Sequence, residues 1–202
     1  INTAGTTNPD GTRHWDFSGA LTGDHTLVIE TVALTGQWFA PDFSGATYTV
    51  RLSDSKDLLG VFELTPSALL LRGVVSPADG ATTRTKVTYS PTASTLTFPM
   101  QKGSTWSTSS TVSGQASGFF TTYTEATTYN VDAAGDLVTP LGTYSVLRIK
   151  AVLTRTVGGF ATTVRTYAFV AECAGTVARV ISNDNESQEE FTTASEVQRT
   201  AP

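Results

Sequence analysis

Apolar and polar residues alternate with a period of two along much of the chain. Between Thr47 and Leu52, tyrosine, valine and leucine alternate with threonine and arginine. A longer stretch from Thr143 to Val157 repeats this pattern. A period of two is typical of β-strands with one buried and one solvated face. In the longer stretch, one side would carry Leu147, Ile149, Ala151 and Leu153.

Turn-forming residues separate these runs. Gly158-Gly159 lies between two strand-like runs and favours a tight hairpin with positive φ angles. Pro66-Ser67, Asp132 to Asp136 and Asn183 to Asn185 also indicate turns. This spacing predicts roughly ten to thirteen strands. Two segments are short helix candidates, namely Ser53 to Leu59 and part of Glu186 to Glu196, and the second also fits a last strand.

The fold class that follows is all-β. A chain of 202 residues fits one such domain. We expect a single antiparallel domain over residues 12–202, either a two-sheet sandwich or a strongly curved, partly closed barrel. Residues 1–11 are rich in Thr, Asn, Gly and Pro, which predicts a flexible N-terminal segment. A division near Ser90-Pro91 into two stacked β halves is the alternative.

The second half of the chain, about residues 96–202, contains a set of motifs with turn and strand character. They are Leu96-Thr97-Phe98-Pro99-Met100, Gly103, Trp106, Val138 to Tyr144 and Cys173 to Arg179. In these motifs the chain resembles an uncharacterised group of bacterial exported lipoproteins and envelope proteins. The resemblance implies an exported β-fold and brings no established activity or functional residue with it.

The amino-acid composition indicates which classes of binding partner and which cellular location to expect. Only 15% of the residues are charged, the net charge is −5, and the 13 basic residues are scattered. Because no basic stripe is present, we expect neither nucleic acid nor an anionic membrane surface as a partner. No apolar run approaches the ~20 residues that span a bilayer. The chain begins at Ile1 without methionine or a signal peptide. We therefore expect a mature chain located extracellularly, in the periplasm or in the outer cell envelope.

Catalytic and cofactor motifs are sparse, and we expect no enzyme and no cofactor. The two histidines, His14 and His25, and the distant Cys173 are too few ligands for a zinc site. We expect Cys173 to be a small buried residue at a strand end. Ser53-Asp54-Ser55-Lys56 matches Ser-x-x-Lys but falls in a polar, turn-like stretch. A glycosidase needs a pair of carboxylates. Within strand-like runs the candidates are Glu30, Glu63 and Glu172.

Two oxygen-rich stretches are weak calcium candidates. The first contains Asp132 and Asp136, and the second contains Asp184 and Glu186. Neither has the spacing of an EF-hand, and the same residue types are ordinary in β-turns. We therefore expect no metal site.

The segment Gln37 to Phe43 holds three large aromatic residues, Trp38, Phe39 and Phe43, and is broken by Pro41. Such side chains either bind a ligand or partner from a loop, or plug one end of the fold. We expect a non-catalytic domain that binds an apolar ligand, a glycan or a protein partner. The alternative is a structural surface protein that self-associates by strand addition, since scarce lysine leaves strand edges unprotected.

Overall fold

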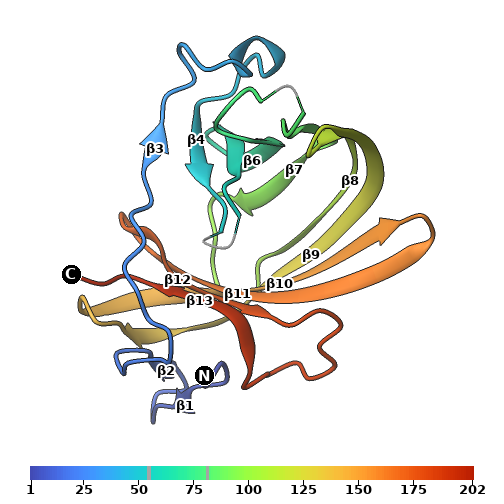
Figure 1. The fold of residues 1–202 in the computed structure, drawn as a ribbon. Coiled ribbons are helices and arrows are strands. Elements are labelled where there is room, and N and C mark those ends of the chain that lie inside the picture. Colours follow the sequence, from blue (N-terminus) through green and yellow to red (C-terminus); the bar gives the residue numbers. More distant parts are fainter. Residues whose placement is uncertain (54–55, 81) are drawn as a thin grey trace.

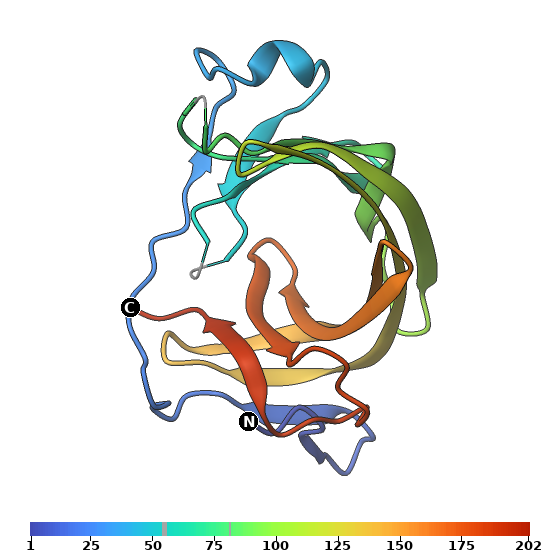
Figure 2. The same ribbon diagram turned by 45° about the vertical axis from the view of Figure 1, so that its right-hand side comes forward.

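A computed structural model describes residues 1–53, 56–80 and 82–202. Most of its strands follow one another as neighbours in a single antiparallel sheet, which curls into a half-barrel (Figures 1 and 2). The sequence prediction of an all-β antiparallel fold is therefore confirmed, and the curved alternative describes it better than the sandwich does. In chain order, the path is β3 (Thr31–Val32), β4 (Tyr48–Arg51), β5 (Leu59–Leu64), β6 (Ala68–Val75), β7 (Lys86–Thr97), β8 (Thr105–Ala116), β9 (Phe119–Val138), β10 (Thr143–Val157), β11 (Phe160–Ala171), β12 (Gly175–Ser182) and β13 (Ala194–Arg199).

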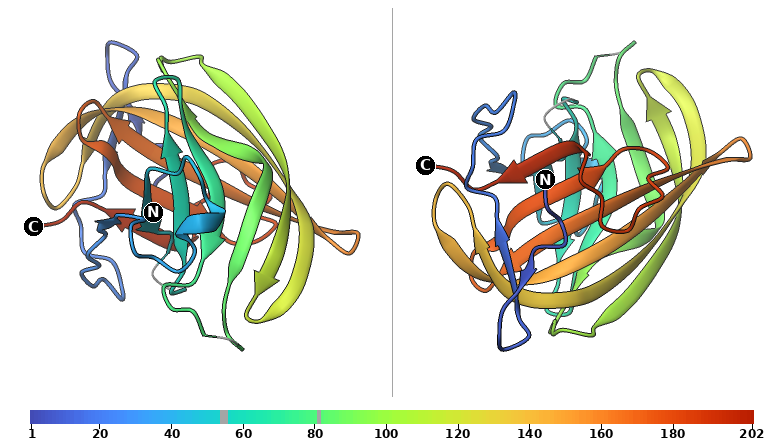
Figure 3. Two further views of the ribbon diagram at one scale, coloured as in Figure 1. Left: turned by 90° about the horizontal axis from the view of Figure 1, so that it is seen from above. Right: turned by 90° about the horizontal axis from the view of Figure 1, so that it is seen from below.

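The N-terminal segment lies against the outside of this sheet. Strand β1 (Thr6–Thr7) pairs with β2 (Arg13–Asp16), and β2 runs parallel to the end of β9. Within the segment Ile1–Gly11, which the sequence predicts to be flexible, Thr3 is buried and its hydroxyl donates a hydrogen bond to the Phe191 carbonyl. Figure 3 shows the segment crossing beneath β9 to β11.

The turn predicted at Asp132 to Asp136 is wrong, because these residues belong to strand β9. It continues to Val138, with a bulge at Asp132, and pairs with β2 from Gly135 onward. A Cβ at Gly135 would lie 1.8 Å from the Arg13 carbonyl oxygen. The glycine therefore permits close approach of two backbones rather than a change of direction.

Several predicted turns are confirmed. Gly158 and Gly159, both with positive φ, join β10 and β11 in register, so that Val157 lies opposite Phe160. Pro66-Ser67 separates β5 from β6. The alternative boundary at Ser90-Pro91 falls inside β7, both ends of which pair with β6. In the described part of the chain, the helical structure is the 3-10 turn η1 (Ala40–Asp42), and the expected helix from Ser53 includes residues 54–55, which lie outside it.

Apolar packing forms three clusters on two faces of the sheet. Trp15, Phe17 and Phe169 belong to a cluster between the N-terminal segment and the outer face of β9 to β12. A second outer cluster holds Phe39 and Phe43 against β5 and β6, while a third lines the inner face at β6 to β8. The outer face is thus covered at both ends of the sheet, by two different parts of the chain.

Candidate functional site

The inner, concave face of the sheet is defined by strand register. Residues directly opposite one another on neighbouring strands point to the same side. Leu153 lies opposite both Thr127 of β9 and Val164 of β11, so these three side chains share one face. That face also carries Arg179, whose guanidinium donates to the Leu52 carbonyl at 2.5 Å, at the β4–β5 loop. Leu52 directly follows β4, near the other end of the strand path from β12, so this hydrogen bond crosses the half-barrel seen in Figure 2 and identifies the face as the inner one.

Apolar side chains on the inner face of β8 to β12 are half-buried rather than packed away. On β10, Leu147, Ala151 and Leu153 share one side, as the alternating sequence predicted, and this side faces inward; Ile149 beside them is buried. Trp106 and Tyr129 stack at 4.7 Å between ring centroids on β8 and β9. Apolar surface that remains accessible in a concavity is typical of ligand sites. The further half-buried members are Val164, Ala168, Val170 and Ile181.

A hollow of about 410 Å3 occupies part of this face. Leu153, Val164 and Ile181 supply apolar lining, while Arg155 and Lys56 supply positive charge and Asp184 negative charge at its border. This volume lies in the range of small-molecule sites, roughly 300–1,000 Å3. The hollow therefore has room for a chain-like or ring-like apolar group with a polar end.

One ion pair is built into the inner wall. Arg155 donates to Glu125 at 2.8 Å, and the Tyr89 hydroxyl donates to the other oxygen of the same carboxylate at 2.9 Å. Burial raises the pKa of Tyr89 well above its usual value, and the Glu125 charge adds to that effect. The carboxylate is thus neutralised within the wall, and nothing in this arrangement supplies a second acid or base for catalysis.

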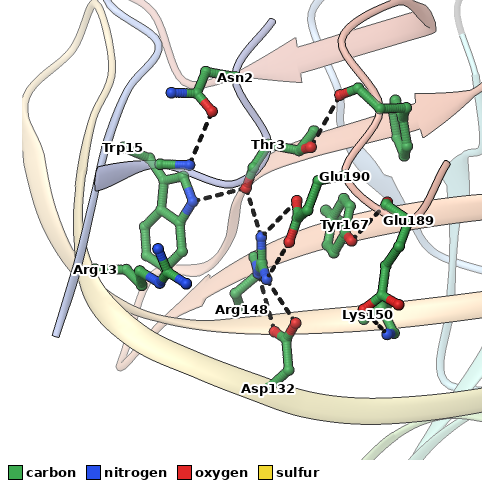
Figure 4. Close-up of polar contacts among 12 residues, drawn as sticks. Asn2, Thr3, Arg13, Trp15, Asp132, Arg148, Lys150, Tyr167, Glu189 and Glu190 are labelled. Carbon is green, nitrogen blue, oxygen red and sulfur yellow. Dashed lines mark hydrogen bonds and ion pairs between the residues drawn. The ribbon is translucent and has the colours of Figure 1, made fainter. Parts of the chain in front are cut away.

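The outer face carries a different polar cluster, centred on Arg148 (Figure 4). Its guanidinium bonds to Asp132 at 2.6 Å and to Glu190 at 2.8 Å, and it also donates to the Thr3 carbonyl. The aromatic ring of Tyr167 lies 4.4 Å from the guanidinium carbon. Burial lowers the pKa of Arg148, but its hydrogen bonds to both carboxylates outweigh that effect and raise the pKa. The charged partners of Arg148 all come from this chain, so we interpret the cluster as a structural link between chain segments.

The three aromatic residues expected to contact a ligand are packed against the outer face instead. Phe39 is fully buried and Phe43 nearly so, in the cluster with Val61 and Val75. Trp38 is half-buried, and its indole N–H donates to the Ser76 carbonyl at 3.1 Å. These side chains cover apolar β5 and β6 on the outer face, rather than plugging one end of the fold.

The other candidate residues are not assembled into a site. Asp132 is engaged by Arg148, and Asp136 is exposed on β9. Asp184 and Glu186 lie in the loop after β12, where Asp184 borders the hollow of about 410 Å3. Residues 1–53, 56–80 and 82–202 contain no group of three or more potential metal ligands. Cys173 is exposed with a positive φ in the β11–β12 turn, which corrects the expected buried position.

The three candidate carboxylates lie on separate parts of the described chain. Glu63 pairs with Arg72 across β5 and β6, Glu172 lies in the exposed β11–β12 turn, and Glu30 is exposed before β3. Ser53 and Lys56 are described, but Asp54 and Ser55 of the motif lie outside the described residues. His14 is on β2, and His25 lies in the segment that leads to β3.

A second, larger hollow of about 1340 Å3 lies along the last strand. Residues 192–201, which include β13, line one side, and residues 21–27 with Ile29 line the other. Within the described chain, β13 pairs with β12 alone, so one edge of the strand is open. An open edge presents backbone donors and acceptors to solvent or to a partner strand.

Comparisons with known proteins gave no match to a family model, to a curated protein or to a solved structure. The resemblance to exported lipoproteins therefore stays a prediction. Among the residues that the structure places, we find no helix with the length and apolar character needed to cross a membrane.

Proposed function

We propose that this chain is a non-catalytic domain of an exported or envelope protein, and that it holds an apolar ligand on the inner face of its curled sheet. One observation carries the proposal: inward-facing apolar side chains of β8 to β12 remain half-exposed around a hollow of about 410 Å3. A folded chain normally covers such a surface, and its own outer face is covered at both ends. A bound apolar group would bury it.

The polar groups of the wall favour an apolar ligand with a polar end. Arg155 is half-exposed at the border of the hollow although Glu125 already pairs with it. A guanidinium has five N–H donors, so it can donate to an oxygen atom of a ligand while keeping this pair. A glycan is supported less, because the aromatic side chains of the Trp38–Phe43 loop, which would stack on sugars, pack against the outer face of β5 and β6.

The test is a fluorescence titration with N-phenyl-naphthylamine, an uncharged apolar probe. We expect saturable binding to the full chain and a loss of about tenfold or more in affinity for Leu153→Asp, which places a charge in the hollow. Val152→Asp is the matched control, because Val152 is the adjacent half-buried residue and points to the outer face. Equal effects of the two substitutions, or no binding by the full chain, would refute the proposal.

A milder variant keeps this test decisive if Leu153→Asp does not fold. Val164→Thr keeps the shape of the side chain and introduces one hydroxyl opposite Leu153. It should weaken probe binding by a few-fold with an unchanged circular dichroism spectrum. An unchanged affinity in a folded Val164→Thr protein would count against the hollow as the binding site.

A second candidate function is self-association by strand addition at β13, which the open edge and the adjoining hollow support. Light scattering across a concentration series should then give a mass that rises with concentration. Ser195→Lys adds a charge at an exposed position of β13 and should keep the chain monomeric. A full chain that stays monomeric at high concentration would remove this candidate.

A further inference from the structure

Large exposed aromatic residues gather at one edge of the sheet. In the described residues, the exposed phenylalanines are Phe119, Phe120 and Phe160, at 79%, 76% and 83% exposure. The first two follow the β8–β9 turn, and Phe160 follows the β10–β11 turn with exposed Val157 opposite it. Strands β8 and β10 run in the same direction, so both turns lie at the same edge.

These hairpin tips are free of ionisable acids and bases over a considerable length. The sequence contains no Asp, Glu, Lys, Arg or His between Thr105 and Thr124, and none between Thr156 and Val164. Nearby Arg84 is engaged by Gln115 and Asp79 and lies over the Trp38 ring. The tips themselves therefore consist of uncharged residues, and the two cations beside the β8–β9 tip, Arg84 and Lys86, are paired with Asp79 and Asp42.

The backbone at the tips satisfies its own hydrogen-bonding groups. Ala116 pairs with Phe119, and Val157 pairs with Phe160, each across a two-residue turn with positive φ angles. A closed hairpin can enter a medium of low polarity without unpaired backbone groups. Figures 1 and 3 show the β10–β11 hairpin extending beyond the rest of the fold, so it can reach such a medium before the body does.

We infer that these two hairpin tips dock on the surface of an electrically neutral lipid layer, with Phe119, Phe120 and Phe160 inserted at the interface. The absence of charge at the tips and the net charge of −5 match zwitterionic lipid and not anionic lipid. Two separate tips at the same edge, of which the β10–β11 hairpin projects, also suit a fluid surface, whereas a protein partner needs one continuous complementary patch. The inference stands on different residues from the proposed ligand site.

The first experiment is flotation of the full chain with phosphatidylcholine vesicles. We expect the protein to float with the vesicles, and the triple variant Phe119→Ser, Phe120→Ser, Phe160→Ser to bind about tenfold more weakly or worse. Vesicles containing phosphatidylserine should bind no better. No flotation of the full chain, or undiminished flotation of the triple variant, would overturn the inference.

Tryptophan variants report the position of each tip. Phe160→Trp and Phe120→Trp should shift their emission to shorter wavelength with vesicles and be quenched by brominated phosphatidylcholine. Leu141→Trp is the matched control, since Leu141 is 53% exposed in the β9–β10 turn at the opposite edge. Equal quenching of all three variants would contradict docking through the tips. Association of the chains with one another through the same phenylalanines, without vesicle binding, would also overturn it in favour of a second copy.

Discussion

Arg148 joins four separate parts of the chain on the outer face of the sheet. It lies on β10 and contacts Asp132 of β9, Glu190 of the loop before β13, and the Thr3 carbonyl of the N-terminal segment. Its side chain is only 5% exposed. A charge buried this deeply depends on these partners, because an unpaired charge in the interior is strongly destabilising.

Replacing Arg148 with methionine should lower the free energy of unfolding by about 2–4 kcal/mol, because Asp132 and Glu190 would stay beside a buried apolar side chain without their cation. Denaturant unfolding followed by circular dichroism measures the change. Arg13→Met is the control, since Arg13 is on β2 and donates to the exposed Thr7 hydroxyl; it should change stability by roughly 0.5 kcal/mol or less. Equal losses in the two variants would show that Arg148 is an ordinary surface arginine.

Buried tyrosines predict how stability depends on alkaline pH. Burial raises the pKa of Tyr89 and Tyr167 above the usual 10.0, and the charges of Glu125 and Glu190 respectively add to it. Above pH 10 the unfolded chain releases protons that the native state retains. The stabilisation is therefore complete below pH 10 and is lost as the pH rises through the folded pKa values.

Tyrosinate absorbance measures this effect. At a pH just above 10, the native protein should show fewer ionised tyrosines than the protein in denaturant, and its denaturation midpoint should fall as the pH rises further. Ionisation of all tyrosines at the unfolded pKa, without unfolding, would contradict the burial described for them.

At the scale of elements, β9 determines how the N-terminal segment attaches. Strand β8 begins opposite Asn130, and β2 takes the same side of β9 from Gly135 to Val138. The contact depends on the missing side chain of Gly135. The outer cluster of Trp15 and Phe17 against Phe169 follows from this placement.

Gly135→Ala should therefore separate β2 from β9. Its Cβ would meet backbone atoms, which cannot move aside as a flexible side chain does, so we expect a loss of about 1–3 kcal/mol in the free energy of unfolding. In the Gly135→Ala variant, amide hydrogen exchange should become faster in β2 than it is in the unsubstituted chain, whereas exchange in β11 should change less. Gly142→Ala is the control, because a Cβ there meets nothing within 4 Å. Equal stability of both variants would contradict the close approach.

Local patterns predicted the elements well where one face of a strand meets water. The alternation in β10 and the Gly158-Gly159 turn are confirmed because both signals are local. Asp132 to Asp136 was mistaken for a turn because the reason for its glycine lies in distant Arg13. The same limit applies to the candidate site: the inward side of β10 was predicted, but Val164 and Ile181 join it only through register. Arg148 was missed because its partners come from distant segments.

At the scale of the whole molecule, the two faces of the sheet differ in how they are covered. The N-terminal segment and the residue range 34–46 cover opposite ends of the outer face. The inner face keeps half-exposed apolar side chains around its hollow, and the exposed phenylalanines lie at one edge. A ligand held inside and a lipid surface met by the hairpin tips would use separate parts of one fold, so the two proposals can fail independently.

The most direct test of the central claim is photo-crosslinking with an alkyl chain that carries a diazirine, followed by mass spectrometry of the labelled peptides. The account predicts labels on inward-facing positions such as Leu147, Leu153, Val164 and Ile181, which excess N-phenyl-naphthylamine should suppress. Labels confined to Phe119, Phe120 and Phe160, or spread evenly over the outer face, would contradict a ligand site inside the half-barrel.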